Sequence, residues 1–441
     1  MTTASAPRQS SSPKTGRDPS YEFGRREAEI VARFPSGKRV AVTRGRVRCY
    51  PGLTSVAPST LAFYQSFVAQ ITGKHVLDAG SGASLGTRLL SEHVSHVTAL
   101  DNDARALEFG REYAPSAEFL QADLCHGLPV DRADAALLID VLGQLPRPER
   151  ALRGLRACLP VGSKLFVAEP KAYASQRLIA PACRAFSKLA LSRLLLRSGF
   201  EVEEAAAGGT NFVMLVARRS SDAALDALVE GFHQVGRGQA NAARSEFARA
   251  RQSARADVRL EAVLGEAEAA FAANEGDVAV RCYFEANELD ATDGRALSGL
   301  ARVALATGEL DDALRLALDA LKRDPTEASA NTAMALAAEQ LSHPEAFNAW
   351  RIATNLAPDD PEVATGLARV AAAKQNYSFA IQVLERLRGY GHALGLEFHV
   401  TLGWLLLADG RKGDAIIEAR YATALAPADH AVRELLSALE A

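Results

Sequence analysis

At 441 residues the chain is too long for one ordinary domain, so we expect two or three domains. The net charge of −3, with 48% hydrophobic and 23% charged residues, excludes a highly charged disordered protein. No stretch approaches the ~20 uninterrupted apolar residues of a membrane span, and the first residues lack the apolar core of a signal peptide. We therefore expect no membrane partner.

The cysteines argue against structural cross-links. There are five of them, an odd number, and no two have the C-x-x-C spacing: Cys49, Cys125, Cys158, Cys183 and Cys282. Such scattered thiols predict neither disulfides nor a metal site, and they fit a reducing, cytoplasmic location.

The first sixty residues are basic. Residues 1–20 are rich in Ser, Thr, Pro and Lys and predict a disordered tail. Residues 1–60 carry eleven Lys and Arg against four acids, and such an arm can touch nucleic acid or an acidic protein. A solvated tail and an exposed hairpin explain the charge more simply, so we do not expect a nucleic-acid partner.

Three short elements are expected before residue 75. The sequence predicts an amphipathic helix over residues 21–34. Residues 39–43 and 46–50 predict a β-hairpin, because hydrophobic and polar residues alternate around a Gly-containing turn. Residues 59–73 predict a second helix, with Ser59 or Thr60 as its cap.

Residues 75–219 alternate between strand and helix patterns, which predicts a mostly parallel sheet with helices on both faces. The last two strands are separated only by a short connection around Gly208, so they must pair as an antiparallel hairpin. Strands are expected near 75–78, 96–100, 117–120, 134–140, 164–168, 199–204 and 211–218, and helices near 86–93, 103–112, 147–158 and 183–198.

After residue 221 strand patterns vanish and a helical repeat begins. Small residues recur at separations of 36, 34, 33, 34 and 35, at Ala243, Ala279, Ala313, Ala346, Ala380 and Ala415. Small residues at such a period allow paired helices to pack closely on their neighbours. The pattern resembles six tetratricopeptide repeats over residues 222–441, with residues 428–441 as a capping helix. An Ala-rich bundle without true repeats is the alternative.

A glycine-rich turn carries the first chemical signal. A predicted strand ends at Asp78, and Gly80, Gly82 and Gly86 follow before a helical pattern begins. Glycines permit positive φ and let a ligand approach the backbone, while a helix N-terminus offers free N–H groups. The turn predicts a nucleotide-like ligand at the carboxyl edge of the sheet.

Acidic residues end the next three strands at the same edge. Asp101 stands 23 residues after Asp78, where its carboxylate can accept hydrogen bonds from both ribose hydroxyls of a nucleoside. Asp123 follows the third strand and can accept from an adenine amine. Asp140 ends the fourth strand, and Gln144 lies just beyond it, so this segment forms a wall beside the reacting centre.

Together these residues resemble the class I S-adenosylmethionine-dependent methyltransferases over about residues 55–220. The resemblance implies a Rossmann-like domain over residues 21–220 and S-adenosylmethionine as cofactor. Its implied cofactor residues are Asp78, Gly80 and Gly82 for the methionine part, Asp101 for the ribose, Asn102, Asp123 and Leu124 for the adenine, and Asp140 beside the reacting centre. Ser84 departs from the pattern, since many members have a third glycine there.

An NAD-binding dehydrogenase is the main structural alternative. Its fingerprint is G-x-G-x-x-G, whereas the glycines here follow G-x-G-x-x-x-G. The closing antiparallel hairpin also favours the methyltransferase.

The methyl acceptor is left open. Methyl transfer needs mainly positioning and exclusion of water, and no catalytic base is evident. Tyr64, Asp140, Gln144 and Glu169 are candidates to line the acceptor pocket, although Tyr64 also fits a core position and Glu169 a cap on a neighbouring segment. Three functions remain: a methyltransferase whose repeats hold a protein substrate or partner, a small-molecule methyltransferase that the repeats dock to an assembly, and a catalytically inactive scaffold.

Overall fold

The computed structural model describes residues 42–43, 46–47, 68, 70–71, 74–82, 84–172, 184, 186–205, 212–389 and 394–440. The predicted tail, the helix over 21–34 and the candidate Tyr64 lie outside these residues. So does most of the helix over 59–73, of which Val68, Gln70 and Ile71 are described and helical. The predicted hairpin is confirmed for the described residues, since β1 (Val42–Thr43) pairs antiparallel with β2 (Arg46–Val47).

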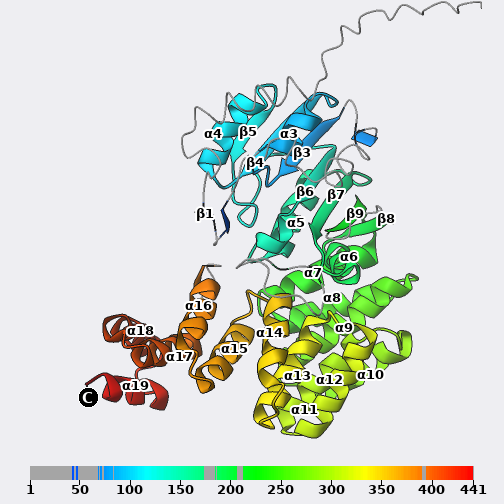
Figure 1. Cartoon of the computed structure of the whole chain (residues 1–441). Helices are drawn as coiled ribbons and strands as arrows, with labels where there is room; N and C mark the ends of the chain where they lie inside the picture. The colour runs from blue at the N-terminus through cyan, green and yellow to red at the C-terminus, as the bar shows by residue number, and fades with distance from the viewer. Residues whose placement is uncertain are drawn as a thin grey trace, which may run out of the picture.

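A seven-stranded sheet forms the first folded part, in the order β5-β4-β3-β6-β7-β9-β8 (Figure 1). Strands β3 to β7 pair in parallel, and β9 runs antiparallel to both β7 and β8. This arrangement confirms the Rossmann-like α/β sheet with a closing hairpin. The strands are β3 (His75–Ala79), β4 (His96–Asp101), β5 (Glu118–Gln121), β6 (Ala135–Ile139), β7 (Lys164–Pro170), β8 (Phe200–Ala205) and β9 (Phe212–Arg219).

Two of the connecting helices, α4 and α6, begin at a residue whose side chain caps them. Asp103 accepts a hydrogen bond from the Arg105 N–H at the start of α4, and Ser187 accepts one from the Ala190 N–H at the start of α6. Pro148 opens α5, where its missing N–H costs nothing. The helices are α3 (Leu85–Leu90), α4 (Ala104–Tyr113), α5 (Pro148–Cys158) and α6 (Lys188–Arg197), with a 3-10 turn η2 (Leu142–Gln144).

The second folded part, α7 to α19, consists of successive helix pairs followed by α19, and we call it the helix array. The six repeat alanines are all buried within it. The described pairs are α7 (Ala223–Gly236) with α8 (Ala240–Ala250), α9 (Ala256–Ala272) with α10 (Gly276–Leu289), α11 (Arg295–Thr307) with α12 (Leu310–Arg323), α13 (Ala328–Gln340) with α14 (Ala346–Leu356), α15 (Pro361–Ala373) with α16 (Tyr377–Arg388), and α17 (Leu396–Ala408) with α18 (Lys412–Leu425); α19 is His430–Glu440.

Glycines in the first helix of a pair receive an aromatic side chain from the preceding pair. The Phe247 ring lies where a Cβ on Gly265 would stand, Tyr283 does the same at Gly299, and Trp350 at Gly366. Each ring belongs to the second helix of its pair, four residues after the repeat alanine. The same contact therefore recurs along the array and holds consecutive pairs together.

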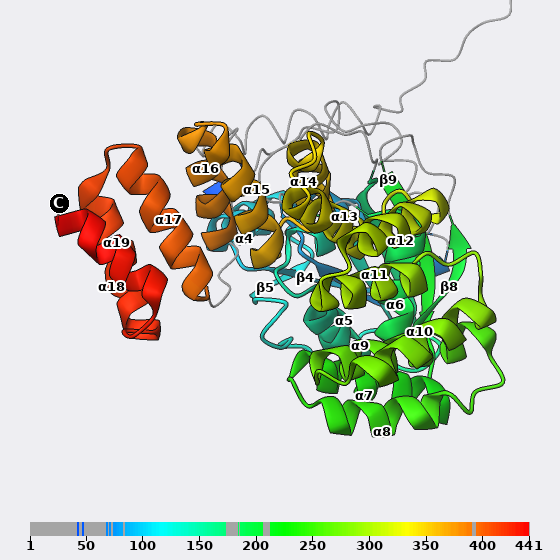
Figure 2. The same ribbon diagram turned by 90° about the horizontal axis from the view of Figure 1, so that it is seen from below.

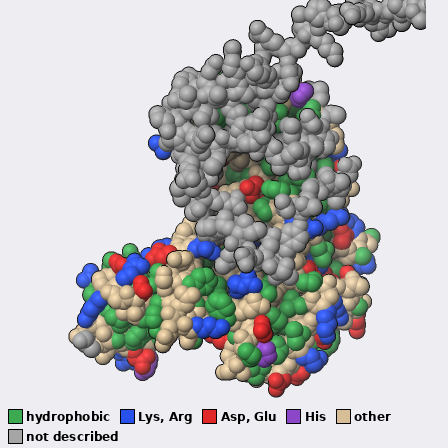
Figure 3. Space-filling model, viewed as in Figure 1, with side chains coloured by type: hydrophobic (Ala, Val, Ile, Leu, Met, Phe, Trp, Pro, Cys, Tyr) green, Lys and Arg blue, Asp and Glu red, His purple; other side chains and the backbone are tan. Residues whose placement is uncertain are grey.

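The array starts beneath α6, passes under the sheet domain and ends at α19, away from the sheet (Figures 1 and 2). On the face shown in Figure 3, hydrophobic and charged side chains of both signs are interspersed over the helices. In the part of the chain that the structure describes, no helix combines the length and apolar character needed to cross a membrane. The cytoplasmic location stays a prediction.

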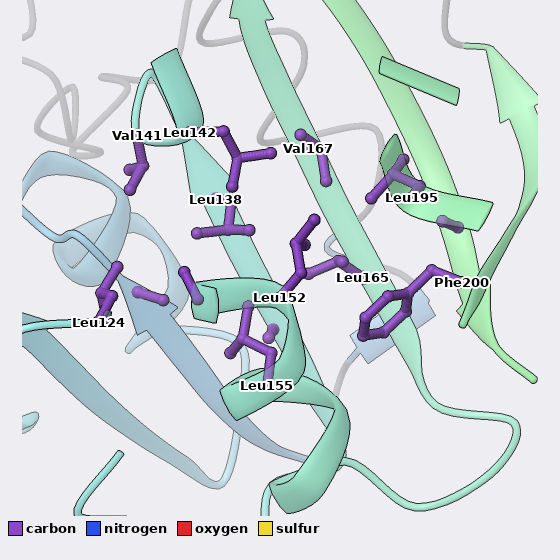
Figure 4. Packing of buried hydrophobic residues seen from close by; sticks show 14 of the residues in the cluster. Leu124, Leu138, Val141, Leu142, Leu152, Leu155, Leu165, Val167, Leu195 and Phe200 are labelled. Carbon is purple, nitrogen blue, oxygen red and sulfur yellow. The ribbon is translucent and has the colours of Figure 1, made fainter. Parts of the chain in front are cut away.

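Apolar side chains fill both faces of the sheet. On one face Leu138, Leu165 and Val167 pack with Leu152 of α5 and Leu195 of α6 (Figure 4). These side chains are all fully buried, and burying one leucine or valine contributes about 1.5–3 kcal/mol. This core holds the carboxyl ends of the strands in fixed positions.

Helix α6 joins the two folded parts. Its Leu196 belongs to the same apolar cluster as Leu225 and Phe247 of the first helix pair. Its Arg197 stacks 4.1 Å from the centre of the Phe232 ring and bonds Glu261 of α9 at 2.7 Å. Apolar packing and the contacts of Arg197 therefore join the sheet domain to the array, and we call this contact region the junction.

Candidate active site

A glycine turn follows β3 at the carboxyl edge of the sheet. Gly80 and Gly82 have φ of 86° and 51°, a region that glycine adopts without cost. The N–H groups of Gly80 and Ser81 both donate to the Leu100 carbonyl of β4, each at 2.8 Å. The turn is thereby anchored across the ends of β3 and β4.

The turn also packs against the loop after β6, which comprises residues 140–147. A Cβ on Gly80 would stand only 2.5 Å from Cγ2 of Val141. Any larger residue at position 80 would therefore push the two loops apart as well as strain the turn. The glycine is required for two independent reasons.

Ser84 occupies the position of the missing third glycine. It has φ of 59°, so it adopts the left-handed conformation at the N-terminus of α3. Its hydroxyl is buried and, among the described residues, has no hydrogen-bond partner. The turn forms with serine here, but at a conformational cost.

Two predicted carboxylates lie directly under the turn. Asp78 accepts a 2.6 Å bond from the Thr87 hydroxyl, and burial raises the pKa of Asp78 to about 6 against the effect of that bond. Asp101, 2% exposed, accepts the Gly82 N–H at 2.8 Å and the Asp103 N–H at 2.9 Å. Asp101 therefore holds the turn directly, and Asp78 holds α3, the helix that follows it.

The predicted adenine residues lie at the same edge, beside β4 and β5. Asn102 is exposed, and its carbonyl accepts the side-chain amide of Gln121 at 3.1 Å. Asp123 accepts the Cys125 N–H at 2.9 Å and faces Nδ1 of His126 at 3.0 Å. Leu124 is buried in the core, which leaves only its backbone for the predicted contact.

The acceptor candidates Asp140 and Gln144 share one turn. Asp140 has φ of 56°, and its N–H donates to the Ala168 carbonyl at 2.7 Å. The side-chain amide of Gln144 donates to the Asp140 carbonyl. A non-glycine residue held at positive φ is uncommon, and such strain concentrates at functional sites.

Glu169 of β7 holds the loop after β6. Its fully buried carboxylate accepts the N–H groups of Val141 at 2.9 Å, Leu142 at 2.7 Å and Gly143 at 3.0 Å. Burial and the Asp140 carboxylate raise the pKa of Glu169 to about 8, while the three N–H donors oppose that rise. The interpretation of Glu169 as a cap on a neighbouring segment is confirmed.

Three polar residues at this edge were not predicted: Ser81, Thr87 and Asp103. The only sequence signal among them is the position of Asp103 before a helix, which marks an N-cap. The Ser81 hydroxyl and the second carboxylate oxygen of Asp103 are buried and unpaired among the described residues. Buried polar oxygens without partners suit a ligand rich in hydroxyl and amine groups.

A comparison with protein families decides the class of this site. Residues 77–167 match the family model described as a methyltransferase domain. This part of the chain is a class I S-adenosylmethionine-dependent methyltransferase domain. S-adenosylmethionine is the cofactor that the domain implies.

The methyltransferase domain also has curated and solved relatives. A ubiquinone biosynthesis O-methyltransferase of Coxiella burnetii is 29% identical over 104 residues, which cover 22% of this chain and 44% of that protein. The chain thus spans less than half the length of this relative. A solved S-adenosylmethionine-dependent methyltransferase from Aquifex aeolicus shares 20% identity over 37% of this chain and 94% of its own, with a TM-score of 0.33. The magnesium protoporphyrin IX methyltransferase of Synechocystis, solved with bound SAH, shares 17% over 37% and 84%, with a TM-score of 0.32.

Proposed function

We propose that this chain transfers a methyl group from S-adenosylmethionine to an acceptor held beside the loop after β6. The observation that carries the proposal is the glycine turn over Asp78 and Asp101 within the stretch that matches the methyltransferase model. The cofactor supplies a reactive methyl group on a positively charged sulfur. The task of the protein is then to orient that group and to exclude water.

We assign the cofactor contacts along the carboxyl edge of the sheet. Gly80 and Gly82 give the methionine part access to the backbone of the turn, and Asp78 holds α3, the helix that follows the turn, through the Thr87 hydroxyl. Asp101 accepts hydrogen bonds from the ribose hydroxyls with its carboxylate, which the N–H groups of Gly82 and Asp103 hold in place. The assigned adenine contacts are Asn102, Asp123 and the Leu124 backbone, and Asp140 lies by the methyl group.

We further infer that the helix pairs are tetratricopeptide repeats that hold a protein substrate or partner. The regular alanine spacing and the recurring ring-on-glycine contacts support this assignment. A cavity of about 530 Å³ opens between the first helices of successive pairs. Phe271, Arg302, Thr332 and Glu362 line it, so it offers apolar and charged contacts to a peptide.

A small-molecule acceptor is the second candidate. It is favoured by the Coxiella burnetii relative, whose name describes an O-methyltransferase of ubiquinone biosynthesis. In that case the array would dock the enzyme to an assembly rather than select the acceptor.

Cofactor binding is tested first. S-adenosylmethionine at about 100 times its Kd should stabilise the full chain by about 2.7 kcal/mol and raise its Tm. Asp101→Asn should reduce that rise, measured against the Tm of the variant without cofactor. Asp131→Asn, a matched change at an exposed site, should leave it unchanged. No rise in the Tm of the parent chain would favour the inactive scaffold.

The acceptor is tested with the full chain and radiolabelled S-adenosylmethionine in a cell lysate separated into protein, nucleic acid and small molecules. Label in protein that is lost in Arg302→Glu, but kept in the exposed-site control Arg281→Glu, would support the protein acceptor. Label in small molecules that both variants retain would support the second candidate. Absence of label from every fraction would overturn the proposed activity.

A further inference from the structure

We propose that Arg184 is a positioning residue, through which Asp359 of the helix array holds the loop after β6 against the glycine turn. This inference rests on the proposed function, because it assigns to the array a direct part in the geometry of the methyl-transfer site. It follows from an unbroken series of contacts that runs from the array to Gly80.

The first contact joins the two folded parts. The Arg184 guanidinium bonds both carboxylate oxygens of Asp359, with Oδ2 at 2.5 Å. Asp359 lies in the turn between α14 and α15, and its side chain is 10% exposed. A pair this poorly exposed is screened less by salt than a surface pair and has a defined geometry.

The second contact joins the Arg184 backbone to the loop after β6. The Arg184 N–H donates to the Gly143 carbonyl at 2.9 Å. In turn, a Cβ on Gly143 would stand 2.2 Å from the Arg184 carbonyl oxygen. The two backbones touch so closely that no side chain fits at position 143, so a shift of Arg184 must move Gly143.

The third set of contacts joins the loop after β6 to the glycine turn. Gly143, Leu142 and Val141 all donate N–H groups to the buried Glu169 carboxylate. The Val141 side chain then lies directly on Gly80. The loop is held by Glu169 from the sheet side and by Arg184 from the array side.

The ion pairs that α6 makes with the helix array differ in this respect. Arg193 and Arg197 bond Asp293, Glu261 and Glu268, but they project from α6, which the sheet core already fixes. Those pairs hold one part to the other. Among the ion pairs between the parts that the structure describes, the Arg184–Asp359 pair is the one that touches the loop after β6.

Hydrogen exchange at the amides of residues 141–143, measured by mass spectrometry on the full chain, tests the proposal. Arg184→Ala and Asp359→Ala should each speed exchange at these amides at least tenfold, because the loop loses its array-side support. Glu268→Ala, which removes a junction pair remote from the loop, should leave their exchange unchanged. The charge-reversed double variant Arg184→Asp with Asp359→Arg should restore protection. Parent-like exchange in the single variants would overturn the proposal.

A second readout separates positioning from simple destabilisation. In the lysate assay, Asp359→Ala should lower the rate of methyl transfer about tenfold while the Tm rise with S-adenosylmethionine stays at the parent value. An equal loss of cofactor binding would contradict the inference, because the turn itself would then be disordered. If the parent chain transfers no methyl group, the proposed function fails, whereas the exchange experiment still decides the role of Arg184.

Discussion

At the scale of single residues, Ser84 is, with Asp140, one of two residues of the candidate site held at positive φ. A non-glycine residue in the left-handed region costs about 1–2 kcal/mol, and the buried Ser84 hydroxyl gains no hydrogen bond in return among the described residues. Ser84→Gly should therefore stabilise the domain by about 1 kcal/mol, with a Tm about 2 °C higher in a thermal melt. Ser81→Gly, at a neighbouring position without positive φ, should lower the Tm instead. A lower Tm in both variants would contradict the inference that Ser84 is strained.

Single residues also differ in whether the sequence alone could predict their place in the site. Asp78, Gly80, Gly82 and Asp101 were predicted as a group, and they meet because adjacent parallel strands end at one edge. Glu169 and Arg184 act through partners that lie 26 or more residues away in the chain. Local spacing holds no information on such contacts, so the support of the loop after β6 was not predicted beyond a general cap.

At the scale of elements, the repeated glycines show that packing overrides helix propensity. Gly299→Ala would ordinarily stabilise a helix by about 1 kcal/mol, but its new Cβ would stand 2.2 Å from the Tyr283 ring. We expect a net loss of about 2 kcal/mol, measured as a lower midpoint in urea unfolding. Gly413→Ala, in α18 where a Cβ meets open space, should raise that midpoint or leave it unchanged. A gain of stability in Gly299→Ala would contradict the close contact between Gly299 and the Tyr283 ring.

Element positions were largely predictable, and their ends less so. Every strand of the seven-stranded sheet was expected within a few residues, because most are apolar runs bounded by turn residues and β8 alternates apolar with acidic residues. Helix α6 was expected from residue 183 but begins at Lys188, since Ser187 caps it and the preceding chain turns back to bond Pro170 and Gly143. A long-range contact set that boundary.

At the scale of the whole molecule, the junction predicts a dependence of stability on pH. Burial alone would raise the pKa of Glu261, but Arg295 and Arg197 outweigh it and lower that pKa to about 2. A carboxyl whose folded pKa is lowered adds stability above its unfolded pKa of about 4.5, and this is lost as the pH falls toward 2. The shift corresponds to a contribution on the order of 3 kcal/mol at neutral pH.

Glu261→Gln tests this dependence, because the amide does not titrate. Its Tm should lie several degrees below that of the parent at pH 7, and the gap should narrow between pH 5 and pH 3. Glu246→Gln, which alters a pair within α8, should change the Tm by much less. A gap that stays constant over this pH range would contradict the role of Glu261. No sequence pattern predicted the ion pair of Glu261 with Arg197, because the two residues lie 64 positions apart in the chain.

The array is attached to the methyltransferase domain at one end. The described ion pairs between the two parts reach α7, α9 and the turns before α9, α11, α13 and α15, whereas α17 to α19 lie well away from the sheet (Figure 1). Each pair in a stacked array contacts mainly its neighbours, so small changes of angle between pairs accumulate toward the unattached end. A partner bound near α11 would be presented to the methyl group at a nearly constant distance. A partner bound near α19 would lie at a varying distance from the methyl group. Binding there therefore suits the recruitment of a partner to the enzyme better than the positioning of an acceptor for methyl transfer.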